Sequence, residues 1–197
     1  MTQYHALTSA PLRPGTACLR PIQILPERVK LSNPATDAMT DLSKVAVISV
    51  RAKTSMDKAN AKMIKYGVRM LVVLDENEQM AGLMTASDIQ GEKPIRYLQR
   101  MGGTRADIMV RDIMTPQREL EVMSIQDVEK ARVGNIVATL KKANRQHSMV
   151  VSEAPDGSQS VCGLFSITQI ARQLGLQVGS LGMASIFTEI ERIAAEQ

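Results

Sequence analysis

Short apolar runs alternate with helically spaced apolar residues along the middle of this chain. A β-branched run at residues 45–50 predicts a strand. Thr54 and Ser55 then offer a helix cap, and the apolar spacing beyond them predicts a helix that ends at Gly67. The continuous apolar run at residues 70–74 is typical of a strand that is buried on both faces. This part of the pattern predicts two strands connected by a helix.

A further strand and helix complete the unit. Residues 75–78 form a polar turn, and residues 80–84 predict the next strand. A helix follows from about Ser87, is interrupted near residues 91–94 and ends at Gly102-Gly103. The predicted order of elements is therefore strand, helix, strand, strand, helix.

The same pattern returns in the second half of the chain. The segment Asp37-Ala38-Met39-Thr40 precedes the first unit, and Asp112-Ile113-Met114-Thr115 stands in the equivalent place 75 residues later. The segment from Gly82 to Ile89 returns, altered, from Gly163 to Ile170. Each copy has a glycine, two apolar residues, a hydroxyl residue and then a polar side chain three positions later. The chain thus predicts two similar halves, and a functional site where they meet.

The differences between the two copies fall in predicted loops. One insertion lies around residues 128–134, and the other lies in the hairpin at residues 153–158, which is rich in turn-forming residues. Because the apolar strands stay in register, the pattern indicates true structural repetition. Two such units would cover each other's exposed sheet faces.

The two ends of the chain lie outside this repeat. We expect residues 1–36 to form an extended N-terminal arm, because Pro11, Pro14, Pro21, Pro26 and Pro34 interrupt regular structure. The arm, including a possible edge strand at residues 19–25, could be docked or loose. Within residues 176–197, an apolar stripe predicts an amphipathic helix (Ile186, Phe187, Ile190, Ile193 and Ala194). That helix could pack on its own body or contact another subunit.

Composition excludes several classes of protein. The net charge of +4 raises the question of nucleic-acid binding, but basic residues alternate with acidic ones, and five aromatic residues are too few for a base-stacking platform. No apolar run approaches the roughly 20 residues of a membrane span. The N-terminus lacks a secretory pattern, and the two cysteines have no metal-binding spacing. We therefore expect a cytoplasmic protein without a metal site or membrane partner.

The repeated unit, its Asp-x-Met-Thr lead-in and its Gly-apolar-apolar-Thr-x-x-Asp ending resemble a CBS domain. Two in tandem resemble the CBS pair, or Bateman module, over about residues 37–175. The resemblance implies an α+β fold, sandwich-like, in which two β-α-β-β-α repeats pack with pseudo-two-fold symmetry. It places the first CBS domain at residues 37–103 and the second at residues 104–175.

The resemblance also implies a function. CBS pairs are not enzymes; they bind adenosine-containing ligands such as AMP, ADP, ATP or S-adenosylmethionine in two clefts between the repeats, usually to regulate a partner. We therefore expect a non-catalytic regulatory module with no required cofactor. With no attached catalytic or transporter domain in this sequence, the effector would be another chain or the terminal extensions. CBS pairs commonly form discs of two copies, so a homodimer is expected.

In similar proteins the aspartate of the repeated ending holds the ribose hydroxyls, and the threonine helps to seat phosphates. These roles carry over to Asp88 and Thr85, with Ser87 beside them, whereas the second copy has Ser166 and Gln169. A carboxylate accepts both donors of a cis-diol, which an amide does less well. Losing one such charge-assisted bond costs about tenfold to a hundredfold in affinity, so the first site is expected to be stronger. Alternatively, Ser87 or Asp88 simply caps its helix.

A second expectation from the resemblance concerns basic residues just before the buried strand. In similar nucleotide-binding CBS proteins they meet phosphates between the repeats. Arg69 and His147 occupy this matched position in the two copies. Arginine would hold a phosphate as a permanent, bidentate cation, whereas the histidine would depend on pH. Alternatively, Arg69 is a surface residue and His147 a neutral capping or turn residue.

Two further hypotheses remain open from the sequence. A CBS pair with degenerate sites could serve as a structural dimerisation or interaction module, which Gln169 favours for one cleft and Asp88 opposes for the other. Nucleic-acid binding through the basic surface is the third, and it would weaken steeply with salt.

Overall fold

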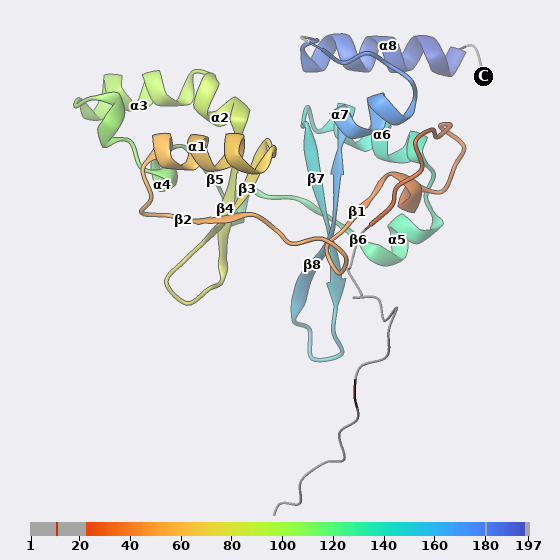
Figure 1. Ribbon diagram of the computed structural model, residues 1–197, viewed down its shortest axis with the longest axis horizontal. Coiled ribbons are helices and arrows are strands. Elements are labelled where there is room, and N and C mark those ends of the chain that lie inside the picture. Colours follow the sequence, from red (N-terminus) through yellow and green to blue (C-terminus); the bar gives the residue numbers. More distant parts are fainter. Residues whose placement is uncertain (1–10, 12–22, 180, 196–197) are drawn as a thin grey trace, which may run out of the picture.

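The computed structural model describes residue 11 and residues 23–179 and 181–195. Two α+β halves stand side by side, each built on its own four-stranded sheet (Figure 1). The predicted fold class is thus confirmed. The elements of the first half are η1 (Ala35–Ala38), β1 (Thr40–Asp41), β2 (Ser49–Arg51), α1 (Met56–Tyr66), β3 (Met70–Leu74), β4 (Met80–Thr85), α2 (Ala86–Gln90), α3 (Lys93–Met101), η2 (Arg105–Asp107) and α4 (Val110–Ile113).

The second half repeats the strand, helix, strand, strand, helix unit of the first, with two helices in the place of α1. Its elements are β5 (Thr115–Pro116), η3 (Gln117–Glu119), β6 (Val122–Ser124), α5 (Ile125–Lys130), α6 (Val133–Lys142), β7 (His147–Glu153), β8 (Gln159–Ser166) and α7 (Ile167–Gln173). The predicted insertion near residues 128–134 falls where α5 ends and α6 begins. A last helix, α8 (Met183–Ala195), follows α7.

Each lead-in segment completes the sheet of the other repeat. The strand orders are β2-β3-β4-β5 and β1-β8-β7-β6. Strand β1, which precedes the first repeat, pairs with β8 so that Asp41 lies opposite Gly163. Strand β5, which precedes the second repeat, pairs with β4 so that Pro116 lies opposite Gly82. The exchange ties the two halves together at the glycines of the repeated segment.

Two expectations about strands need correction. Strand β2 begins at Ser49, so residues 45–48 lie outside any strand. In β3, burial alternates: Leu71 and Val73 lie in the core, whereas Met70 and Val72 are only half-buried, so the prediction that both faces are buried is wrong. Residues 45–48, Met70 and Val72 all line a cleft between the halves, so their apolar side chains are not fully covered by other elements.

Each half has its own apolar core. The first is built around Met56, Leu71 and Met84, and the second around Phe165 and Ile170. Helix α8 adds its predicted stripe to the second core, with Ile186, Phe187 and Ile190 buried there. This helix therefore packs on its own body through the first three residues of the stripe, whereas Ile193 is half-buried and Ala194 is exposed.

The described part of the N-terminal arm is docked. The Gln23 side chain donates to the carbonyl of Met39 and accepts from the amide of Asp41. Val29 is buried, and its amide donates to the carbonyl of Gln173. Most of the arm, including residues 19–22 of the suggested edge strand, lies outside the described residues, and residues 23–25 form no strand.

Candidate ligand-binding clefts

Two clefts lie between the halves, and each takes residues from both repeats. The first cleft, of about 290 Å³, is bounded by the junction of β4 and α2, by β5, by residues 144–149 and by Met183. The second cleft, of about 470 Å³, is bounded by the junction of β8 and α7, by β1, by residues 45–48 and by residues 67–70. Each cleft thus joins the repeated ending of one repeat to the lead-in and helix-to-strand junction of the other.

This arrangement divides the expected site residues between the clefts. Thr85, Ser87 and Asp88 line the first cleft. Arg69, Ser166 and Gln169 line the second. His147 lines both. Arg69 therefore shares a cleft with Gln169 of the second repeat, and not with Asp88 of its own repeat.

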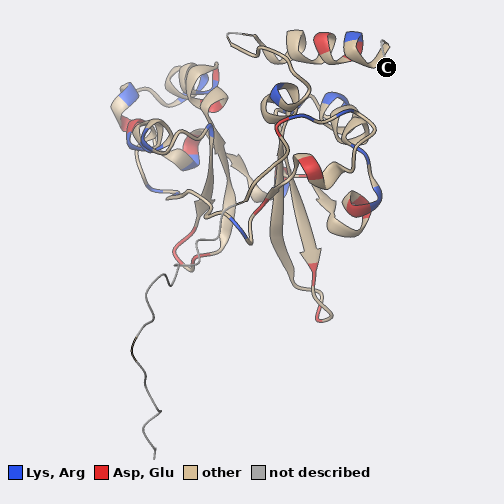
Figure 2. Ribbon diagram, turned by 45° about the vertical axis from the view of Figure 1, so that its right-hand side comes forward, with Lys and Arg blue, Asp and Glu red and all other residues tan. Residues whose placement is uncertain are grey.

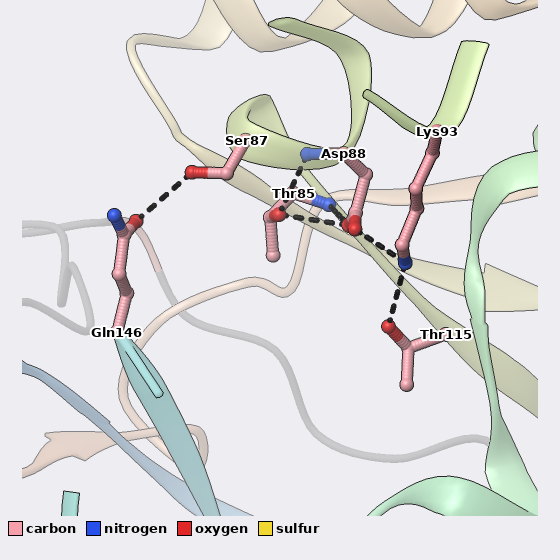
Figure 3. Close-up of polar contacts among 6 residues, drawn as sticks. All are labelled: Thr85, Ser87, Asp88, Lys93, Thr115 and Gln146. Atoms are coloured by element: carbon pink, nitrogen blue, oxygen red, sulfur yellow. Dashed lines mark hydrogen bonds and ion pairs between the residues drawn. The ribbon is translucent and has the colours of Figure 1, made fainter. Parts of the chain in front are cut away.

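Asp88 caps its own helix. Its Oδ2 accepts hydrogen bonds from the amide and the hydroxyl of Thr85, both at 2.7 Å, and the Thr85 hydroxyl accepts from the Asp88 amide at 3.3 Å (Figure 3). This is a capping box, in which Thr85 is the N-cap residue of α2. The capping interpretation therefore holds for Asp88, although it does not exclude a further contact at the other carboxylate oxygen.

That other oxygen faces a lysine. Lys93, at the start of α3, places its Nζ 2.6 Å from Asp88 Oδ1 and 3.3 Å from the Thr115 hydroxyl (Figure 3). Asp88 is only 9% exposed. A ribose diol that binds Asp88 must therefore share Oδ1 with Lys93 or displace it, a constraint that the sequence pattern did not reveal.

Ser87 makes a contact between the repeats. Its hydroxyl lies 3.3 Å from Oε1 of Gln146, which precedes β7 in the second half (Figure 3). Arg145 in the same cleft forms an ion pair with Glu121 at 3.4 Å. The charges of the first cleft are therefore balanced, since Arg145 and Lys93 each face a carboxylate.

The second cleft is cationic. Among its described lining residues are Arg69 and Arg172 but no aspartate or glutamate. Arg172 was missed at the sequence level. It follows Gln169 by three residues on α7, a spacing that puts both on one helix face, and this spacing is the signal that could have revealed it. Ser166 forms no side-chain cap bond to α7.

His147 lies between the two clefts, opposite Ser166 in the β7–β8 pair. Burial, and then the nearby Arg69 guanidinium, lower the pKa of His147 to about 4, against a smaller opposite effect of Asp88. Its Nδ1 is buried without a hydrogen-bond partner among the described residues. The ring is therefore neutral at pH 7, and an anion placed beside it would favour protonation.

The low pKa of His147 predicts an acid-sensitive fold. An unfolded histidine has a pKa of about 6.5, so the unfolded chain binds a proton more readily than the folded one. The contribution of neutral His147 is fully present above about pH 6.5 and is lost as the pH falls toward about 4. The loss is on the order of 2–3 kcal/mol. Urea unfolding between pH 7 and 4.5 should show a shallower pH dependence for His147→Gln; equal slopes for both proteins would contradict this expectation.

Basic and acidic residues are interspersed along the described part of the chain. Lysines and arginines alternate with acidic residues over both halves (Figure 2). In the described part of the chain, no helix is both long and apolar enough to cross a membrane. No group of three His, Cys, Asp or Glu side chains among these residues could hold a metal ion.

Comparison with known proteins finds one matching family model and several structures of similar fold. The model of the CBS domain family matches residues 35–92. No curated protein matches the sequence. Among solved structures, an uncharacterised conserved protein from Pyrococcus horikoshii aligns with a TM-score of 0.53 at 22% identity, over 78% of this chain and 100% of that one.

Two further solved structures agree in fold. A CBS-domain protein from Agrobacterium tumefaciens aligns with a TM-score of 0.52 at 15% identity, over 73% of this chain and 94% of that one. A conserved CBS domain protein of unknown function from Thermoplasma acidophilum aligns with a TM-score of 0.50 at 20% identity, over 81% of this chain and 78% of that one. At these identities the likeness concerns the fold.

Proposed function

Because the chain contains a CBS domain and has the fold of a tandem CBS pair, we propose that it is a non-catalytic regulatory module that binds an adenosine nucleotide between its repeats. One observation carries this proposal. The second cleft joins apolar walls, which suit a base, to Arg69 and Arg172, with no acidic lining residue among those described. Two arginines that form no ion pair with a described carboxylate in such a cleft suit a phosphorylated ligand.

The charge of the second cleft discriminates between the candidate ligands. AMP, ADP and ATP carry phosphates, which complement Arg69 and Arg172. S-adenosylmethionine has a net positive charge, because its sulfonium and ammonium groups outweigh its single carboxylate, and so complements the same arginines less well. We therefore assign AMP, ADP or ATP, rather than S-adenosylmethionine, to this cleft.

The first cleft suits the nucleoside part of such a ligand. Asp88 Oδ1 is the acceptor for the ribose hydroxyls. Lys93 either moves away from that oxygen or shares it with the ribose. Thr85, engaged with Asp88, fixes the carboxylate rather than seating phosphate directly. Gln169 at the corresponding place in the second cleft offers weaker ribose contacts, so that cleft relies on phosphate recognition.

The competing function is a structural interaction module with empty clefts. The bonds that Asp88 forms within its own half favour this structural function for the first cleft.

Exposed apolar side chains on the outer helices (Ile64, Ile95 and Met101) would suit a homodimer or a separate effector protein. We propose a homodimer with the ligand-binding function as well; light scattering that finds only a monomer near 22 kDa would contradict the dimer. The interleaving of basic and acidic residues along the chain favours neither nucleic-acid binding nor a role at a membrane.

A thermal-shift panel tests the proposed function. At a hundred times its dissociation constant, a ligand adds about 2.7 kcal/mol of stability, or roughly 5–10 °C for a chain of this size. We expect ATP, ADP and AMP to raise the melting temperature and S-adenosylmethionine to have a smaller effect. If all four compounds leave it unchanged, the sensor function is wrong and the structural module is favoured.

A further inference from the structure

Helix α8 forms part of the wall of the first cleft. Its first residue, Met183, lines that cleft together with Thr85 and Asp88. Three residues later its buried stripe begins, and Ile186, Phe187 and Ile190 pack into the second apolar core. The helix lies across the second half next to α7 (Figure 1). One element thus contacts both the candidate ligand site and the core of one repeat.

The surface beneath α8 differs between the repeats. Ala171 and Leu174 belong to the apolar cluster that includes Ile186 and Phe187. The two repeats are related here by the 81 residues that separate Gly82 from Gly163. By this relation Ala171 and Leu174 correspond to Gln90 and Lys93 of the first repeat, which are both exposed. The second repeat is therefore adapted to be covered by a helix at positions where the first repeat is polar.

Glycines and an exposed ion pair mark the attachment of α8 outside its apolar stripe. The connection from α7 contains Gly175, Gly179 and Gly182, of which the first two have positive φ values. Beyond its apolar stripe, α8 forms an ion pair between Glu191 and Lys141 on α6, and both side chains are more than one-third exposed. Surface ion pairs of this kind contribute little to stability. Docking of α8 therefore depends on one apolar face.

We propose that α8 is the ligand-responsive element of this protein. A nucleotide in the first cleft packs against Met183 and holds α8 on the second repeat, and an empty cleft releases the helix more often. The position of α8 then reports occupancy of the cleft. This inference rests on the proposed function, because it concerns the same ligand. By thermodynamic reciprocity, docking of α8 must strengthen ligand binding by the factor with which the ligand strengthens docking.

Amide hydrogen exchange of the full chain, with and without saturating AMP, tests the inference. We expect AMP to slow exchange within α8 by about fivefold or more, a typical size for such coupling. Met183→Ala should remove this protection while AMP still binds. Leu181→Ala is the matched control, since Leu181 is exposed and does not line the cleft, and it should retain the protection.

The reciprocal measurement uses variants of α8 itself. Ile190 is buried, so Ile190→Asp should undock the helix and weaken AMP binding in calorimetry by about fivefold or more. Thr188→Asp places the same charge on the exposed side and should leave the affinity unchanged. If AMP binds while α8 exchange stays the same, or if Ile190→Asp binds AMP as the wild type does, the inference is wrong and the proposed function stands. If calorimetry detects no binding of AMP, ADP or ATP, both are wrong.

Discussion

Replacement of Gly82 by alanine is expected to lower the free energy of unfolding by about 1–3 kcal/mol, the usual range for overpacking of a dense interior. A Cβ at this position would overlap the carbonyl oxygen of Thr115 and lie 3.1 Å from the Cα of Pro116. Both obstacles are backbone atoms of β5, the strand that joins the second repeat's lead-in to the sheet of the first. The chain can accommodate the methyl group only by separating β4 from β5. Because Thr115 lines the first cleft, the separation would also reshape that cleft.

The corresponding glycine of the second repeat provides the control. A Cβ at Gly163 would meet the side chain of Met39, with the sulfur at 2.5 Å. A methionine side chain is flexible and can adopt another rotamer, whereas the Thr115 carbonyl cannot move independently of its strand. Urea unfolding should therefore show a smaller loss for Gly163→Ala than for Gly82→Ala. Equal losses of stability would mean that the close approach of β5 is not the reason why position 82 requires a glycine.

Removal of the two arginines of the second cleft is expected to abolish measurable binding of ATP. Each charge-assisted contact to a phosphate contributes about 1.5–3 kcal/mol, so either single alanine variant should lose about tenfold to a hundredfold in affinity. The double variant Arg69→Ala/Arg172→Ala should lose more, although neighbouring effects do not add exactly. Calorimetric titration with ATP measures these losses.

Arg100→Ala is the matched control for that series. Arg100 is exposed on α3 and lines neither cleft, yet its replacement changes the net charge by the same amount. It should leave ATP affinity nearly unchanged. A comparable loss in Arg100→Ala would show that the overall charge of the protein, rather than the second cleft, attracts the nucleotide. Unchanged affinity in the double variant would contradict the cleft assignment.

Much of the fold follows from the apolar pattern and its repetition. Helix α1, strand β3, the interruption near Gly91 and helix α8 lie close to where the sequence predicts them. Residues 45–48 were wrongly predicted as strand, because a β-branched run that lines a cleft has the same composition as one that forms a strand. The exchange of β1 and β5 between the sheets was also missed. Strands of two residues are too short to show a period in the sequence.

The candidate site was harder to predict than the fold, because its residues come from different repeats. The sequence singled out Asp88 and Arg69 separately, but only the three-dimensional arrangement places Arg69 across from Gln169 and Asp88 beside Lys93. The expectation that the first site is the stronger one considered the ribose contact alone. With Lys93 at the Asp88 carboxylate and two arginines in the other cleft, phosphate recognition now favours the second cleft.

The central claim, that a nucleotide binds between the repeats, can be tested directly with methionine methyl groups as probes. Met70 lines the second cleft, and Met149 lines both clefts. Met101, at the end of α3, is exposed and lines neither cleft. In an NMR titration of protein labelled at the methionine methyls, ATP should shift the Met70 and Met149 resonances and leave that of Met101 in place. Shifts at Met101 alone, or no shift at saturating ATP, would contradict the claim.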